Sequence, residues 1–170
     1  MVYHSVTSAE GSPQACSCAL LPLRTNVRGP ASITTDTDVV DEAINYFRAN
    51  VLFRNFDVKG PSDKMLVYLT LVVGQYLQRF QAIKTKAEAS KAVFQLALEP
   101  FLLPGDAGFV LGGHLTTPAS RQESEAWRSW VKQAREEMGL RLVEKCFTAS
   151  GEPNKYWLAF ACRKFLNKQL

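Results

Sequence analysis

The sequence predicts an all-α fold: a compact bundle of about five to six helices behind an irregular N-terminal strap. Apolar residues recur at helical spacing in several segments. A residue type that caps helices stands before each of these segments. No pair of segments shows the alternation typical of paired strands. A chain of 170 residues is by default one domain, so we expect a single domain over 1–170, with the strap at 1–35 and the helical body at 36–170.

The strap, residues 1–35, has no helical period and is rich in proline and glycine turn signals. Leu20, Leu21 and Leu23 are its most apolar stretch. We expect these leucines to fix an otherwise irregular segment onto the helical body.

The first helix is expected to begin near Asp38. Thr37 or Asp38 can cap it, and Asp41 and Glu42 fall in the first turn, where the helix dipole favours acids. One apolar stripe follows at helical spacing, formed by Val40, Ala43, Ile44, Phe47 and Val51.

The second helix is expected over residues 63–84, starting at Ser62 or Asp63. Its first half has almost no polar face, and a helix that is apolar all round is a buried one. A buried strand over 65–73 is the alternative, but Tyr76, Leu77 and Phe80 continue at helical spacing and favour a helix. We therefore expect this helix to be enclosed by the others.

A capping box predicts the start of the third helix. Thr85 can accept from the third helical N–H, and the Glu88 side chain can reach back. Pro100 closes the helix. Residues 101–118 then form an 18-residue loop with four glycines and two prolines.

A second capping box, Ser120 with Glu123, opens the fourth helix. Gly139 is a good residue to end it. One more short helix is expected around Leu140–Phe147. The apolar side of the fourth helix is formed by Trp127, Trp130, Val131, Ala134 and Met138.

The C-terminal segment, 153–170, interleaves aromatic and basic residues. Asn154 can cap a last helix, whose inner stripe would be Trp157, Phe160, Ala161 and Phe165. Lys and Arg exceed Asp and Glu by four in the whole chain, and the entire excess falls after residue 138. Such an asymmetry predicts a basic face directed at an acidic partner. The bases concerned are Arg141, Lys145, Lys155, Arg163, Lys164 and Lys168.

The residues offer little for catalysis. The two histidines are His4 and His114, and a nucleophilic cysteine needs a base within hydrogen-bond reach. Cys146 and Cys162 stand in apolar contexts, where a free cysteine is most often a small core residue. We expect no enzyme; an enzymatic role would require a reactive His114 or Cys162.

No metal or nucleotide site is predicted. Cys16, Cys18 and His4 are three ligands at the wrong spacing for a structural zinc, which needs four. The glycines at 104–113 suggest a phosphate loop, but His114 and Leu115 follow where Lys and Ser or Thr are needed. Turn formation is the better reading of these glycines, and we expect no cofactor.

Other partner classes receive little support. The body of the chain is neutral and has no nucleic-acid-binding signature. No signal peptide is visible, and the longest apolar run is too short to span a bilayer, so we expect an intracellular protein with no membrane insertion.

Over nearly its whole length the sequence resembles the p21-Arc family, subunit 3 of the actin-related protein 2/3 complex. The most specific block is Asp36–Asp38, Asp41–Ile44, Phe47, Ala49–Val51 and Phe53–Phe56. Earlier matches are Tyr3–Ser5, Leu20–Leu23 and Gly29–Ala31. Later matches are Pro104–Gly105, Gly108–Phe109, Gly139–Leu142, Lys155, Trp157, Lys164–Phe165 and Asn167.

The resemblance implies a helical fold with one helix enclosed by the rest. It implies a subunit without an active site, in an assembly that nucleates actin filaments as branches. It also implies packing on actin-related protein 3, a place near the mother filament, and a location in the cytoplasm and actin cytoskeleton. ATP and its metal would belong to the actin-related subunits.

We therefore expect one class of function and keep a second as the alternative. The first is a structural and interaction subunit that uses Arg163, Lys164 and Lys168 as exposed contacts, with Arg141 and Lys145 behind them. The alternative is a basic nucleic-acid-binding module that uses the C-terminal segment, whose affinity would fall steeply with salt.

Overall fold

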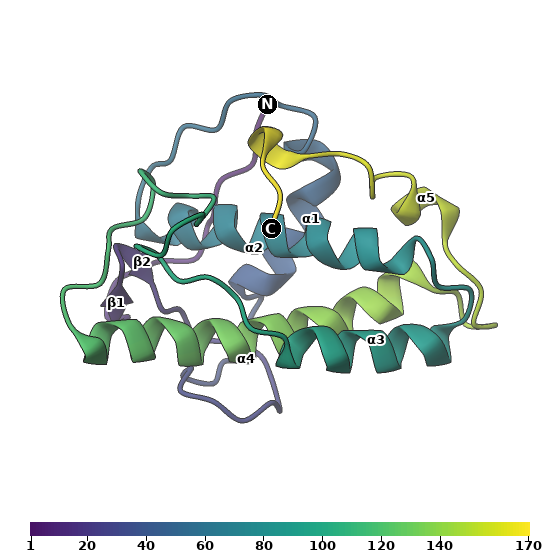
Figure 1. Ribbon diagram of the computed structural model, residues 1–170, viewed down its shortest axis with the longest axis horizontal. Helices are drawn as coiled ribbons and strands as arrows, with labels where there is room; N and C mark the ends of the chain where they lie inside the picture. The colour runs from purple at the N-terminus through teal and green to yellow at the C-terminus, as the bar shows by residue number, and fades with distance from the viewer.

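The computed structural model describes residues 1–170 and is mostly helical, with one small sheet. Helix α2 (Pro61–Phe80) crosses the middle of the molecule in Figure 1, and α1 (Val39–Asn50) passes behind it at an angle. Helices α3 (Lys86–Leu98) and α4 (Arg121–Cys146) lie side by side below α2 in this view. The chain ends in the short helix α5 (Lys155–Leu158) and the 3-10 turn η1 (Phe165–Asn167).

Helix α2 has the segment and the type that its apolar run predicts, and the strand alternative is wrong. Thirteen of its 20 residues are buried, and it contacts α1, α3 and α4. It begins at Pro61, earlier than expected, because proline fits the first position of a helix. It ends at Phe80 rather than near Lys84. None of the helices combines the length and apolar content needed to cross a bilayer.

Helix α1 begins where the sequence predicts. Asp38 is its N-cap and forms a capping box with Asp41, in which each side chain accepts from the backbone N–H of the other. The expected stripe from Val40 to Val51 is buried.

The predicted N-caps of α3 and α4 are confirmed, but the return contact of each capping box is wrong. Glu88 accepts from the N–H of Lys84 and Glu123 from that of Ala119, in each case the residue before the cap. Thr85 accepts from the N–H of Glu88, and Ser120 accepts from the N–H of Glu123. The carboxylate of Glu123 accepts from Ala119 and also from Cys16 in the strap, at 2.8 Å. This second contact ties the start of α4 to the N-terminal segment.

Helix α4 does not end at Gly139, and the separate short helix expected after it is wrong. One continuous helix of 26 residues runs to Cys146. A Cβ at Gly139 would stand 2.9 Å from Cβ of Val93 and 3.2 Å from the ring of Tyr76. The glycine is therefore a point of close helix approach.

The strap contains a strand pair that the sequence analysis did not predict. Strands β1 (Gln14–Ala15) and β2 (Cys18–Ala19) form an antiparallel hairpin that lies against α2 and α4. The rest of the strap is irregular, as expected. Leu20, Leu21 and Leu23 are buried in the same apolar core as the helices.

The C-terminal segment is not the single helix expected. The helical turn ends at Leu158, and Leu166 and Asn167 have positive φ angles of 54° and 56°. Trp157, Ala161 and Phe165 are nevertheless buried, while Phe160 is half-buried. The segment covers the core through separate anchors.

Candidate protein interaction surface

After α5 the C-terminal segment runs back along α2 and ends near the middle of that helix in Figure 1. Asn154 caps α5 by accepting from the N–H of Tyr156 at 3.0 Å. The segment is anchored by Trp157, over whose ring the guanidinium of Arg48 lies at 4.9 Å. The apolar anchors face the core, and the intervening residues point outward.

Five of the six predicted interface bases lie on the outside. Lys145 lies in the last turn of α4 and is exposed, as are Lys155, Arg163 and Lys164, whereas Lys168 is half-buried. None of the five forms an ion pair in the structure. Their charges are therefore available to a partner, and we call these five residues the basic surface.

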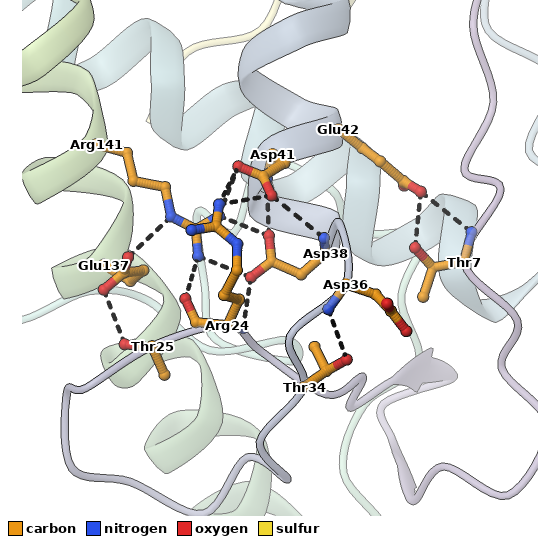
Figure 2. A network of polar contacts seen from close by, with 10 residues as sticks. All are labelled: Thr7, Arg24, Thr25, Thr34, Asp36, Asp38, Asp41, Glu42, Glu137 and Arg141. Carbon is orange, nitrogen blue, oxygen red and sulfur yellow. Dashed lines mark hydrogen bonds and ion pairs between the residues drawn. The ribbon is translucent and has the colours of Figure 1, made fainter.

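Arg141 is the exception, because its charge is used inside the molecule. Its guanidinium contacts the carboxylates of Asp38 at 2.6 Å, Glu137 at 2.8 Å and Asp41 at 3.0 Å (Figure 2). The Arg141 side chain is only 11% exposed. Its predicted place among the exposed bases is therefore corrected: it joins α4 to the start of α1.

The same network holds the strap. The N–H of Arg24 donates to Asp38 at 2.8 Å, and its guanidinium pairs with Asp41 at 2.9 Å. Thr25 donates to Glu137 at 2.8 Å. Figure 2 shows strap, α1 and α4 meeting at these side chains. This is a structural junction and presents no free charge of either sign.

The electrostatics of the junction follow from its pairing. Burial alone would raise the pKa of Asp38 and lower that of Arg141. Burial is the largest single effect on each group, but their mutual hydrogen bonds, the backbone N–H groups of Asp41 and Arg24, the Glu137 carboxylate and the opposite charges together outweigh it. The pKa of Asp38 therefore lies below its usual value and that of Arg141 above it. Both groups stay charged over the physiological pH range.

Three residues that the sequence does not predict as part of the site lie next to the basic surface. Leu52, Phe53 and Arg54 follow α1 and are exposed. With Arg163 and Lys164 they line a groove of about 350 Å³. The only sequence signal for these three residues is their position: two large apolar residues and a base come directly after Val51, where the apolar stripe of α1 ends.

The histidines and cysteines considered for catalysis differ in burial and in hydrogen-bond partners. Nδ1 of His4 contacts the buried carboxylate of Asp63 at 2.7 Å, while His114 is exposed and has no side-chain hydrogen bond. Burial raises the pKa of Cys146 to about 12, which keeps that thiol protonated. Cys162 is exposed, and its Sγ has only a backbone carbonyl as partner.

No group of three or more His, Cys, Asp or Glu side chains lies close enough to hold a metal ion. Burial raises the pKa of Cys16 to about 11 and of Cys18 to about 12. Gly105, Gly108 and Gly113 have positive φ angles, as glycines in tight turns do.

The features described above are surfaces and structural contacts, and similarity to known proteins gives the family. The model of the family described as P21-Arc, the ARP2/3 complex ARPC3 (21 kDa) subunit, matches residues 1–170. The chain belongs to the P21-Arc family.

Relatives in this family are similar over their full length. The actin-related protein 2/3 complex subunit 3 of Arabidopsis thaliana is 48% identical, with 98% of each chain covered. The subunit 3 of Dictyostelium discoideum is 41% identical with all of both chains covered. That of Schizosaccharomyces pombe is 40% identical, covering 99% of this chain and 98% of its own.

Proposed function

We propose that this chain is a non-catalytic structural and interaction subunit of an actin-related protein 2/3 complex, the assembly that nucleates branched actin filaments. Full-length similarity to three relatives that bear this name supports the proposal. Its place in the cell is then the cytoplasm, within the actin cytoskeleton. Its mechanical contribution is buried contact area that stiffens the assembly.

The proposed partners are actin-related protein 3, on which the subunit packs, and the mother filament. The observation that carries this step is the basic surface, five bases without a carboxylate partner in their own chain. Bases at the rim of an interface set orientation and association rate more than affinity. An interface of ordinary size buries roughly 800 Å² on each side. We place the groove beside Arg163 and Lys164 within this proposed interface.

Charge reversal tests the proposal. The natural chain is replaced, in the cells that make it, by the variant Arg163→Glu with Lys164→Glu. The amount of actin-related protein 3 that co-purifies with the variant and the formation of branches are then measured. We expect about tenfold less co-purified actin-related protein 3 and fewer branches, because the reversed charges slow association, with unchanged helix content in the free chain. The matched control is Lys91→Glu with Lys132→Glu, two exposed bases on α3 and α4 that form no ion pair. Equal loss in both pairs, or in neither, would remove the basic surface from the proposal.

The nucleic-acid alternative has a separate test. It requires binding of RNA or DNA whose logarithmic affinity falls linearly with the logarithm of salt concentration. Absence of any mobility shift at low salt for the wild-type chain eliminates it, and a shift abolished by the Arg163 and Lys164 reversal would favour it.

A further inference from the structure

A second charged site lies at Arg135 on the inner side of α4, in a pocket whose Gln75 and Gln169 also border Arg163 and Lys168 of the basic surface. Arg135 is only 2% exposed. No ion pair of the structure includes it. Arginines are almost never fully buried without a carboxylate partner, so this guanidinium stands out in the molecule.

The contacts that Arg135 does make leave it incompletely satisfied. Nη2 donates to Oε1 of Gln75 at 2.9 Å, and the guanidinium lies 5.0 Å from the centre of the Phe101 ring. Its Nε has no hydrogen-bond partner, and neither does the nearby hydroxyl of Tyr68. Burial raises the pKa of Tyr68, so this hydroxyl stays protonated and can donate. Two buried donors are thus without an acceptor.

These groups line a pocket of about 260 Å³. Tyr68, Gln75, Arg135 and Gln169 form its polar side, Phe101, Leu102 and Phe109 its apolar side, and Leu170 at the end of the chain also lines it. A planar guanidinium with free N–H groups matches the two oxygens of a carboxylate. Because an unpaired buried charge is costly, a carboxylate is the group that would complete this site.

The surroundings of the pocket indicate that a protein carries this carboxylate. Phe94 and Leu98, one turn apart on α3, are 62% and 63% exposed, and Leu102 on the pocket wall is 48% exposed. Of these three residues Leu102 lines the pocket, and Leu98 ends α3 two residues before Pro100 of the pocket lining. Exposed apolar residues around a buried arginine are typical of the centre of a protein interface. A small carboxylic acid would leave this exposed apolar ridge uncovered.

We propose that the pocket receives an Asp or Glu side chain of a neighbouring subunit, which pairs with Arg135 and accepts from Tyr68, while Phe94, Leu98 and Leu102 pack around it. This inference rests on the proposed function, since it needs an assembly. It predicts that Arg135 is unfavourable in the free chain and favourable in the complex.

Removing the charge separates these two effects. For Arg135→Met we expect an unfolding temperature of the free chain equal to or above that of the wild type, because an uncompensated charge is removed. We also expect recovery of actin-related protein 3 with the tagged chain to fall by about tenfold or more. A purely structural role predicts a lower unfolding temperature instead, and that result would overturn the inference. The control Lys132→Met removes an exposed charge from the same helix and should change neither quantity.

A milder variant keeps the test decisive if Arg135→Met fails to fold. Tyr68→Phe removes only a hydroxyl that has no partner in the free chain, so its unfolding temperature should not fall, while recovery of the partner subunit should drop by roughly fivefold.

Photo-crosslinking tests the occupant of the pocket. In the assembled complex, p-benzoylphenylalanine in place of Leu102 should crosslink to a subunit segment containing Asp or Glu. Crosslinks only to segments without an acid, or none at all, contradict the proposal.

Recovery of partner subunits with the wild-type chain distinguishes failure of the proposed function from failure of the pocket inference alone. If the wild-type chain recovers no actin-related subunit, the proposed function fails, and the pocket inference fails with it. If it does, and both Arg135→Met and Tyr68→Phe recover equal amounts, only the pocket inference is wrong.

Discussion

Two arginines on α4, the buried Arg135 and the half-buried Arg141, have opposite surroundings. Arg141 contacts three carboxylates, whereas Arg135 contacts none. The sequence gives no way to tell them apart, because the acids around Arg141 come mainly from α1, about a hundred residues earlier. The chemistry of each residue is thus set by the tertiary contact and not by its neighbours along the helix.

The pairing of Arg141 predicts a large and pH-dependent loss in the Arg141→Met variant. Removing one partner leaves the fully buried carboxylate of Asp38 uncompensated, which costs about 3–5 kcal/mol of unfolding free energy near neutral pH. The lowered pKa of Asp38 means that its stabilising contribution is present above about pH 4 and is lost as pH falls through the folded-state pKa. In the variant this pKa rises, so the difference between variant and wild type should shrink as pH falls from the raised pKa of the variant to the lowered pKa of the wild type.

Urea unfolding between pH 3 and pH 7 measures this difference. Lys145→Met, one turn further along α4 and unpaired, is the control and should stay within about 0.5 kcal/mol of wild type. A pH-independent loss for Arg141→Met would show that lost packing, and not the charge, is responsible.

The close approach at Gly139 predicts opposite effects of one substitution at two helical glycines. In Gly139→Ala the new methyl meets Val93 Cβ at 2.9 Å, and we expect a net loss of about 1–2 kcal/mol after the gain in helix propensity. In Gly74→Ala on α2 the nearest atom lies at 4.0 Å, so we expect a gain of about 0.5–1 kcal/mol. Urea unfolding compares them, and gains at both sites would mean that α3 can move away from α4.

At the scale of elements, the sequence predicts helices well where local signals decide. Caps at Asp38, Thr85 and Ser120 are side-chain to backbone contacts within one turn, and all three are found. The end of α4 was missed because Gly139 serves a contact with α3 that no local pattern reveals. The hairpin was missed because Cys16 and Ser17 take positive φ angles in its turn, where glycine or asparagine is the usual signal.

The candidate surface was predictable to a similar degree. Charge asymmetry identified the basic C-terminal segment, and Lys155, Arg163 and Lys164 are exposed. The pairing of Arg141 and the contribution of Arg54 to the groove were not predictable, since both depend on which distant segment lies alongside.

The attachment of the strap predicts local release by a single change in α1. The buried carboxylate of Glu42 accepts from the hydroxyls of Ser5 and Thr7 and from the N–H groups of Val6 and Thr7. In Glu42→Ala these donors turn to water, so we expect amide exchange at Val6 and Thr7 to rise by about tenfold or more. Exchange in α2 should stay near wild type. Glu10→Ala, an exposed acid in the same strap, is the control, and equal exchange in both variants would contradict the attachment.

The whole molecule shares one apolar core. Cys16 and Cys18 of the hairpin belong to the same cluster of 45 buried residues as the centre of α2 and the end of α4. A strap built into the core cannot leave without exposing it. We therefore expect the strap hairpin and the helical body to unfold together as one cooperative unit.

The four thiols test this directly. Cys162 is exposed, while Cys16, Cys18 and Cys146 are fully buried. With a thiol reagent at pH 8, Cys162 should react at once and the other three at least about a thousandfold more slowly, because they wait for unfolding. In Cys162→Ser the three remaining thiols should then react with one common rate, since hairpin and body open in the same event. Reaction of Cys16 and Cys18 ten times ahead of Cys146 would mean that the hairpin detaches first and that the strap is a separate unit laid on the helical body.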